Sequence, residues 1–189
     1  MGDPAKLVGS DALTPTASLS KDYFLLFPYQ AVASGTASKI RVRSGTVANI
    51  KVAIYSNSGG EPVALLSSGQ SSMVIGTNDI AISDIQIITS EIYWFGYITD
   101  INAAVLLGSQ PPVSRRYKAE LFATFDFPST PSGLTTSSTT SHPVISAWGT
   151  LASGGAGRLI GSGDPSMIHV GHPKMIHVAN PSLIRARGG

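Results

Sequence analysis

The sequence predicts an all-β fold: a jelly-roll-like antiparallel β-sandwich with an extended C-terminal arm of three octad repeats. Apolar and polar residues alternate with a period of two in Lys39–Arg43 and Asn49–Tyr55, which is typical of half-buried strands. Turn-forming residues separate such segments, and no convincing amphipathic helix is present. A series of roughly eight or nine short strands favours a sandwich. Hydrophobic residues make up 42% of the 189 residues, which is enough to build a core.

The chain divides into four segments by composition. Residues 1–20 are small and polar and are predicted to form an extended N-terminal arm. Residues 21–150 form the predicted sandwich, 151–163 a Gly/Ser-rich linker, and 164–189 a repetitive C-terminal arm. The strands expected in the sandwich are Tyr23–Phe27, Lys39–Arg43, Asn49–Tyr55, Ser72–Ile75, Asp79–Ile82, Glu91–Ile98, Ala103–Leu107, Tyr117–Phe122 and Val144–Trp148. The Ser/Thr-rich segment Ser129–Ser141 is expected to be a long loop.

The strand pattern also predicts the core. The residues expected to be buried are Ile40, Val42, Ile50, Val52, Ile54 and Trp94. Glu91–Ile98 is apolar on both faces, so we expect it in the middle of a sheet. Trp148 is also expected in the core, although an exposed tryptophan could instead stack on a sugar.

Part of the sequence resembles a β-sandwich domain of phage structural proteins and bacterial surface proteins. The resemblance spans about residues 21–150 and lies in Lys39–Val42, Ile50–Pro62, Leu65–Leu66, Tyr93–Tyr97, Arg115–Lys118 and Ala147–Thr150. It contains no diagnostic catalytic signature. The resemblance implies a decoration, fibre or adhesion module.

The C-terminal arm is the most specific feature of the sequence. Three tandem octads occupy residues 164–171, 172–179 and 180–187, with prolines in register at Pro165, Pro173 and Pro181. Each octad predicts one short strand that opens at its proline, where a missing N–H is tolerated. The residues predicted to mediate assembly are Met167, Ile168, His169, Val170, Met175, Ile176, His177, Val178, Leu183, Ile184 and Arg185.

The octads place apolar residues on both faces, so a lone exposed strand cannot satisfy them. Two arrangements satisfy them: the arm pairs with a sheet edge or groove of a neighbouring subunit, or several arms wind together on a symmetry axis. A disordered tail is the third alternative. The predicted partner is therefore the protein itself, as a homo-oligomer or polymer, with other virion or filament proteins as further candidates.

No motif for catalysis or cofactor binding is found in the chain. Cysteine is absent, and no nucleophile elbow, phosphate loop or dinucleotide fingerprint is present. His169, His172 and His177 suggest a metal site, but the repeat position of His169 and His177 becomes Arg185 in the third octad, and arginine does not ligate metals. We therefore expect a protein that is not an enzyme and binds no cofactor or metal.

Net charge and hydropathy limit the partners that the protein is expected to bind and the location in which it is expected to act. The formal net charge of +2 gives no electrostatic case for nucleic acid, and no apolar stretch is long enough to cross a membrane. No signal peptide is recognised, so we expect synthesis in the cytoplasm and a final location in a virion or an extracellular assembly. The leading hypothesis is a non-enzymatic self-assembling virion component, such as a capsid decoration, head-fibre or tail protein. The alternative is a carbohydrate-binding or adhesion module of a surface or extracellular filament protein.

Overall fold

The computed structural model describes residues 4–11, 21–102 and 104–152. These residues form ten β-strands and no helix. The strands are β1 (Ala5–Gly9), β2 (Tyr23–Gln30), β3 (Gly35–Ser44), β4 (Ala48–Ser58), β5 (Glu61–Met73), β6 (Gly76–Ile87), β7 (Ile92–Thr99), β8 (Leu107–Ala119), β9 (Thr135–Pro143) and β10 (Ile145–Leu151).

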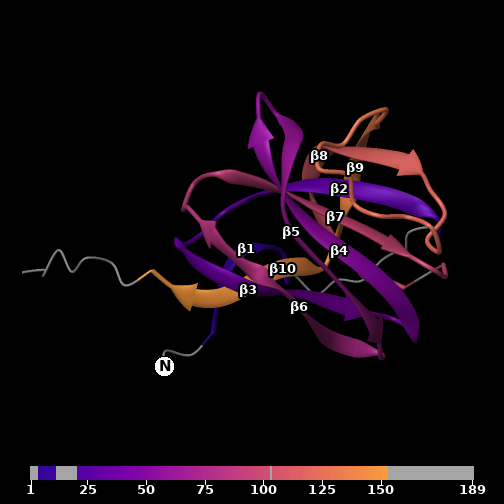
Figure 1. Cartoon of the computed structure of the whole chain (residues 1–189), viewed down its shortest axis with the longest axis horizontal. Coiled ribbons are helices and arrows are strands. Elements are labelled where there is room, and N and C mark those ends of the chain that lie inside the picture. Colours follow the sequence, from indigo (N-terminus) through magenta and orange to yellow (C-terminus); the bar gives the residue numbers. More distant parts are fainter. Residues whose placement is uncertain (1–3, 12–20, 103, 153–189) are drawn as a thin grey trace, which may run out of the picture. The chain divides into compact units, whose positions relative to one another are not determined.

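The strands form two antiparallel sheets, which confirms the predicted all-β sandwich (Figure 1). One sheet has four strands in the order β1-β10-β3-β6, and the other has six in the order β5-β4-β7-β2-β8-β9. The chain crosses between the sheets repeatedly, so strands that are distant in sequence become neighbours. Strand β10, for example, pairs with both β1 and β3.

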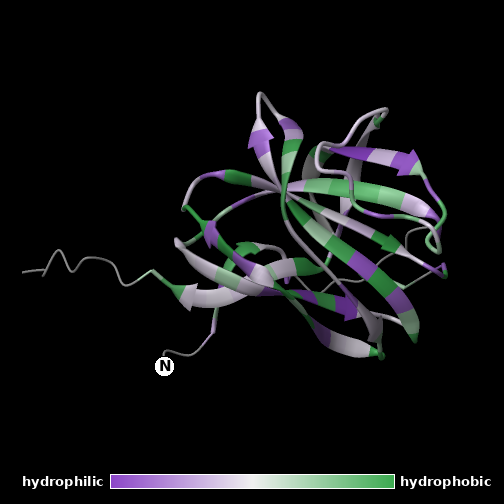
Figure 2. Cartoon of the chain, viewed as in Figure 1, coloured by the Kyte–Doolittle hydropathy of each residue, from purple (hydrophilic) through white to green (hydrophobic). Residues whose placement is uncertain are grey.

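The main core lies between the two sheets and follows the predicted alternation. All six residues expected to be buried are at most 2% exposed: Ile40, Val42, Ile50, Val52 and Ile54 lie in this core, and Trp94 lies in a second core on the other face of the six-stranded sheet. Hydrophobic and hydrophilic bands alternate along β4 in Figure 2. The β4–β5 hairpin closes through Gly59 and Gly60, whose φ angles of 59° and 82° suit a tight hairpin turn that other residues adopt only at a cost.

A second, smaller core covers the outer face of the six-stranded sheet. The segment 120–134 between β8 and β9 places Phe125 and its neighbours over outward-facing Phe24, Tyr55 and Trp94. Tyr55 Oη donates a hydrogen bond to the Pro128 carbonyl at 3.1 Å. This cover explains why β7 is apolar on both faces. The prediction that β7 lies inside a sheet is confirmed, since it is flanked by β4 and β2.

The predicted N-terminal arm is wrong where residues 5–9 are concerned. Ala5–Gly9 forms β1, which pairs with β10 at the edge of the four-stranded sheet. Leu7 and Val8 are completely buried, and this pair of apolar side chains is what anchors so short a strand. At the other end, β10 extends to Leu151, and the Ala152 N–H donates to the Ser34 carbonyl, so the sandwich continues past Thr150.

The structure also differs from the predicted loop at Ser129–Ser141 and from the predicted strand at Ser72–Ile75. Thr135–Pro143 is an edge strand rather than a loop, because threonine suits extended backbone and an edge strand needs few apolar side chains. In the predicted strand Ser72–Ile75, the exposed Val74 and Ile75 form a turn that the Asn78 side chain closes by bonding to both backbone groups of Val74.

Two predicted strand boundaries also differ. Of the strand expected at Ala103–Leu107, Ala103 lies outside the described residues, Val105 forms an isolated bridge with Ser44, and Leu107 begins β8. The strand expected at Tyr117–Phe122 ends at Ala119, where the chain enters the covering segment 120–134.

Candidate functional site

A surface cavity of about 260 Å³ lies on the outer face of the four-stranded sheet. Its lining includes Asp11, Arg41, Arg43, Thr77, Ser146 and Trp148. The alternation that buries Ile40 and Val42 directs Arg41 and Arg43 to the opposite face of β3. In β10, the alternation that buries Ile145 and Ala147 in the main core directs Ser146 and Trp148 to the outer face of the sheet. Strand pairing then brings these side chains together from β3, β6 and β10.

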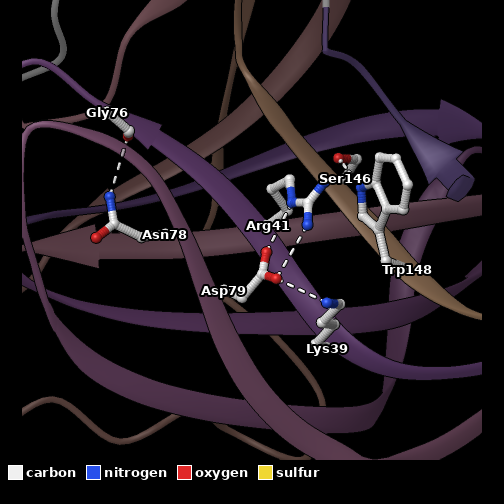
Figure 3. A network of polar contacts seen from close by, with 7 residues as sticks. All are labelled: Lys39, Arg41, Gly76, Asn78, Asp79, Ser146 and Trp148. Carbon is white, nitrogen blue, oxygen red and sulfur yellow. Dashed lines mark hydrogen bonds and ion pairs between the residues drawn. The ribbon is translucent and has the colours of Figure 1, made fainter. Parts of the chain in front are cut away.

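Arg41 is held in a fixed orientation beside this cavity. Its Nε lies 2.7 Å from Oδ1 of Asp79 and its Nη2 lies 3.0 Å from Oδ2, which is a bidentate pair (Figure 3). Lys39 Nζ also bonds to Asp79 Oδ2 at 2.7 Å. The hydrogen bonds from Arg41, and then from Lys39, lower the pKa of the Asp79 carboxyl to about 2. Asp79 is therefore ionised at neutral pH, and it orients the guanidinium of Arg41.

Trp148 forms the aromatic wall of the cavity. The Cζ atom of Arg41 lies 4.2 Å from the centroid of the Trp148 ring, within the range of a cation–π contact. The indole N–H of Trp148 donates to Ser146 Oγ at 2.8 Å. The predicted core position of Trp148 is wrong, because the residue is half-buried and lies on the outer face. Trp94, in contrast, is 2% exposed, and its indole donates to Asn57 at 2.9 Å.

The cavity and its rim carry an excess of positive charge. Four cations, Lys6, Lys39, Arg41 and Arg43, accompany two carboxylates, Asp11 and Asp79. Three of these cations have a carboxylate partner: Lys6 pairs with Asp11, and Lys39 and Arg41 pair with Asp79. The guanidinium of Arg43 makes no hydrogen bond or ion pair with any described residue, although the residue is half-buried. A bound anion would satisfy it.

The residues predicted to mediate assembly all belong to the C-terminal arm, which lies outside the described residues. Their role therefore stays a prediction. His169, His172 and His177 also lie outside the described residues, so the expectation that they bind no metal stays a prediction as well. Within the described ranges, no three His, Asp or Glu side chains gather where they could hold a metal ion. The same residues contain no helix that is long and apolar enough to span a membrane.

Sequence reasoning missed the cavity, although one signal for it was present. The alternation in Lys39–Arg43 places three cations on the outward face of one strand. The neighbours of that face were not predictable, because Asp79 and Trp148 come from strands 38 and more residues away in sequence.

Comparisons with protein-family models, with curated proteins and with solved structures found no match for this chain.

Proposed function

We propose that this protein is a non-enzymatic, self-assembling structural protein, such as a virion component, in which the octads of one copy add as strands to a sheet edge of another. The observation that carries the proposal is the threefold octad repeat, with its prolines in register and its apolar residues on both faces of each predicted strand. Such segments require a partner, and a symmetric assembly supplies one.

Strand β9 supports the proposal because it is a sheet edge of nine residues that lacks the charged side chains with which edge strands commonly prevent pairing; the irregularity in its ladder lies on β8, between Ser109 and Val113, and its one proline, Pro143, is its last residue. Natural edge strands avoid unwanted pairing through charge, short length, bulges or cover. Within the described part of the chain, β9 pairs with β8 alone. Its nine residues contain no lysine, arginine, aspartate or glutamate. An octad matches it in length.

The other three edges differ from β9. Strand β1 has five residues and carries Lys6. Strand β6 carries Asp79 and Asp84. Strand β5 packs against β6, where Ser67 Oγ donates to the Ser83 carbonyl at 3.0 Å. Strand β9 is therefore the edge we propose for strand addition.

Sedimentation velocity of the full chain tests the proposal against three variants. Deletion of residues 164–189 should leave a folded monomer where the full chain assembles. Ser138→Lys places a charge at an exposed position of β9 and should weaken assembly, whereas Ser58→Lys, at a serine of the β4–β5 hairpin that is also exposed, should not. Assembly by the deletion variant as complete as that of the full chain refutes the proposal. If Ser138→Lys assembles normally while the deletion variant does not, the octads bind elsewhere.

A second candidate function, a carbohydrate-binding or adhesion module, is favoured by the composition of the cavity. An aromatic ring beside charged and hydroxyl side chains is the combination that sugar sites use, because the ring packs on C–H groups and the polar groups bind hydroxyls. Titration of the full chain with simple glycosides tests this function, since sugar binding at the cavity should disappear in Trp148→Leu. If none of the glycosides binds, the carbohydrate-binding function is contradicted.

A further inference from the structure

We propose that the cavity between Arg43 and Trp148 binds a carboxylate-bearing sugar, such as a uronic or sialic acid, at the end of a glycan chain. This inference rests on the carbohydrate-binding candidate function and narrows it to acidic saccharides. Three properties of the site support it: an arginine that has no partner among the described residues, an oriented aromatic wall, and a lining that includes both hydroxyls and a carboxylate.

The charge of the site favours an anionic ligand. Residues 1–150 contain nine cations and ten carboxylates, yet the cavity and its rim hold four cations and two carboxylates. Of these four cations, Arg43 is the one whose side chain has no hydrogen-bond or ion-pair partner among the described residues. A guanidinium presents a planar set of donors that matches a carboxylate, so Arg43 provides the anion contact.

Arg41 has a different role, since Asp79 and Trp148 already hold it. The bidentate contact with Asp79 orients the guanidinium of Arg41, and the stacking of this guanidinium on Trp148 orients the indole ring, so the side chains of Arg41 and Trp148 are held in place before a ligand binds (Figure 3). A pre-oriented site avoids the entropy cost of ordering side chains on binding. Trp148 then provides an apolar surface for the C–H groups of a sugar ring.

The remaining lining favours a sugar over a phosphate group. Asp11 lines the cavity, and its carboxylate, which pairs with Lys6, accepts hydrogen bonds from sugar hydroxyls; a sugar ring offers several such donors, whereas a phosphate monoester dianion offers none on its phosphate group. Thr77 adds an exposed hydroxyl that both donates and accepts, whereas Ser146 is 1% exposed and its Oγ accepts from the indole of Trp148, so its role is to orient that ring. The volume of about 260 Å³ is below the roughly 300 Å³ at which pockets for drug-sized ligands begin, so the site suits one terminal ring.

Ligand-observed saturation-transfer NMR on the full chain tests the inference, because it works whether or not the protein assembles. The probes are the methyl glycosides of glucuronic, galacturonic and N-acetylneuraminic acids. Methyl glucoside and methyl galactoside are the neutral counterparts of the first two, and the methyl ester of the third glycoside is its neutral counterpart, so each pair differs at one carboxylate. At least one acid should bind with a dissociation constant on the order of 1 mM or tighter. Its neutral counterpart should bind at least about tenfold more weakly, since a charge-assisted hydrogen bond is lost.

Variants then assign the contact to the cavity. Arg43→Gln should weaken binding of the acid about tenfold or more and bring it close to that of the neutral sugar. Lys118→Gln is the matched control, because Lys118 lies on β8 of the other sheet, and it should bind as the unmodified protein does. Trp148→Leu should abolish binding of both sugars. Should that variant fail to fold, Arg43→Gln still decides the question.

Each contrary outcome has a distinct meaning. Equal affinity for acidic and neutral sugars overturns the inference while the carbohydrate-binding function stands. Failure of every sugar to bind overturns both. Binding that Arg43→Gln leaves unchanged overturns the assignment to this cavity. Displacement of the acid by inorganic phosphate, or by a single-stranded oligonucleotide, at equal concentration would identify a general anion site and overturn the choice of a saccharide.

Discussion

Replacing Phe125 by alanine tests whether the segment 120–134 is a structural layer of the fold. Phe125 is 6% exposed, and its ring centroid lies 4.9 Å from that of Phe24 and 5.1 Å from that of Phe127. A phenylalanine buries about 150–250 Å². At about 25 cal/mol per Å², this burial corresponds to roughly 4–6 kcal/mol.

The expected loss for Phe125→Ala is smaller than that burial figure. The unfolded chain already buries roughly 10–40% of this area, and alanine retains the Cβ atom. A connecting segment also relaxes into the space left behind more easily than a central strand does. We therefore expect the free energy of unfolding to fall by about 3 kcal/mol, the lower end for Phe-to-Ala replacements in a core.

Urea unfolding followed by circular dichroism measures this loss, with Leu121→Ala as the control. Leu121 lies in the same segment but is 65% exposed, so its replacement should change stability by no more than about 0.5 kcal/mol. Equal stability of the two variants would mean that the segment only connects β8 to β9. The explanation given for the two-sided apolar pattern of β7 would then fail as well.

Three further variants test other parts of the fold by the same unfolding assay. Ile54→Ala removes a completely buried side chain of β4 and should cost about 2–5 kcal/mol, and a negligible loss would contradict the assigned inward face. Gly69→Ala would bring a Cβ atom to 2.3 Å from the Ala81 carbonyl oxygen, so β5 or β6 must shift. We expect this shift to lower the free energy of unfolding by about 1–3 kcal/mol. Unchanged stability would show that the two strands are further apart than the structure places them. For Asp79→Asn, the carboxyl has a lowered pKa when folded, so its contribution is complete above about pH 4 and is lost as the pH falls toward 2. The stability difference between the unmodified protein and Asp79→Asn should therefore shrink from pH 6 to pH 2, and a constant difference would argue against the Arg41 contact.

The central strands were predictable because the two faces of each strand have different surroundings. In β3 and the first half of β4 the polar side chains face outward and the apolar ones inward, so a period of two appears in the sequence, whereas Ala53 and Tyr55 of β4 face outward into the second core. Edge strands lack this contrast. The first seven residues of β9 are serine and threonine and little packs on them, whereas His142 and Pro143 at its end are buried; β1 has only Leu7 and Val8 to indicate that it is structured.

The cavity could be predicted only in part. The outward cations of β3 follow from alternation, but the positions of Asp79 and Trp148 depend on which strands pair and in what register. Register is a long-range property that the hydrophobic pattern of one strand does not contain. Trp148 in particular was predicted to be in the core because it is a large aromatic residue in the expected final strand, but Ile145 and Ala147 occupy the inward face of β10 and Trp148 the outward face.

The two outer faces of the sandwich differ in a way that bears on function. The six-stranded sheet has its outer face covered by the segment 120–134, which buries Trp94. The outer face of the four-stranded sheet holds no comparable cluster of buried apolar residues within the described ranges, and Trp148 there remains half-buried beside charged side chains. A tryptophan held by Arg41 at a solvent-accessible cavity is oriented without being covered. Ligand binding is therefore expected on the four-stranded face and strand addition at β9 of the other sheet, so the two proposed activities do not compete for the same surface.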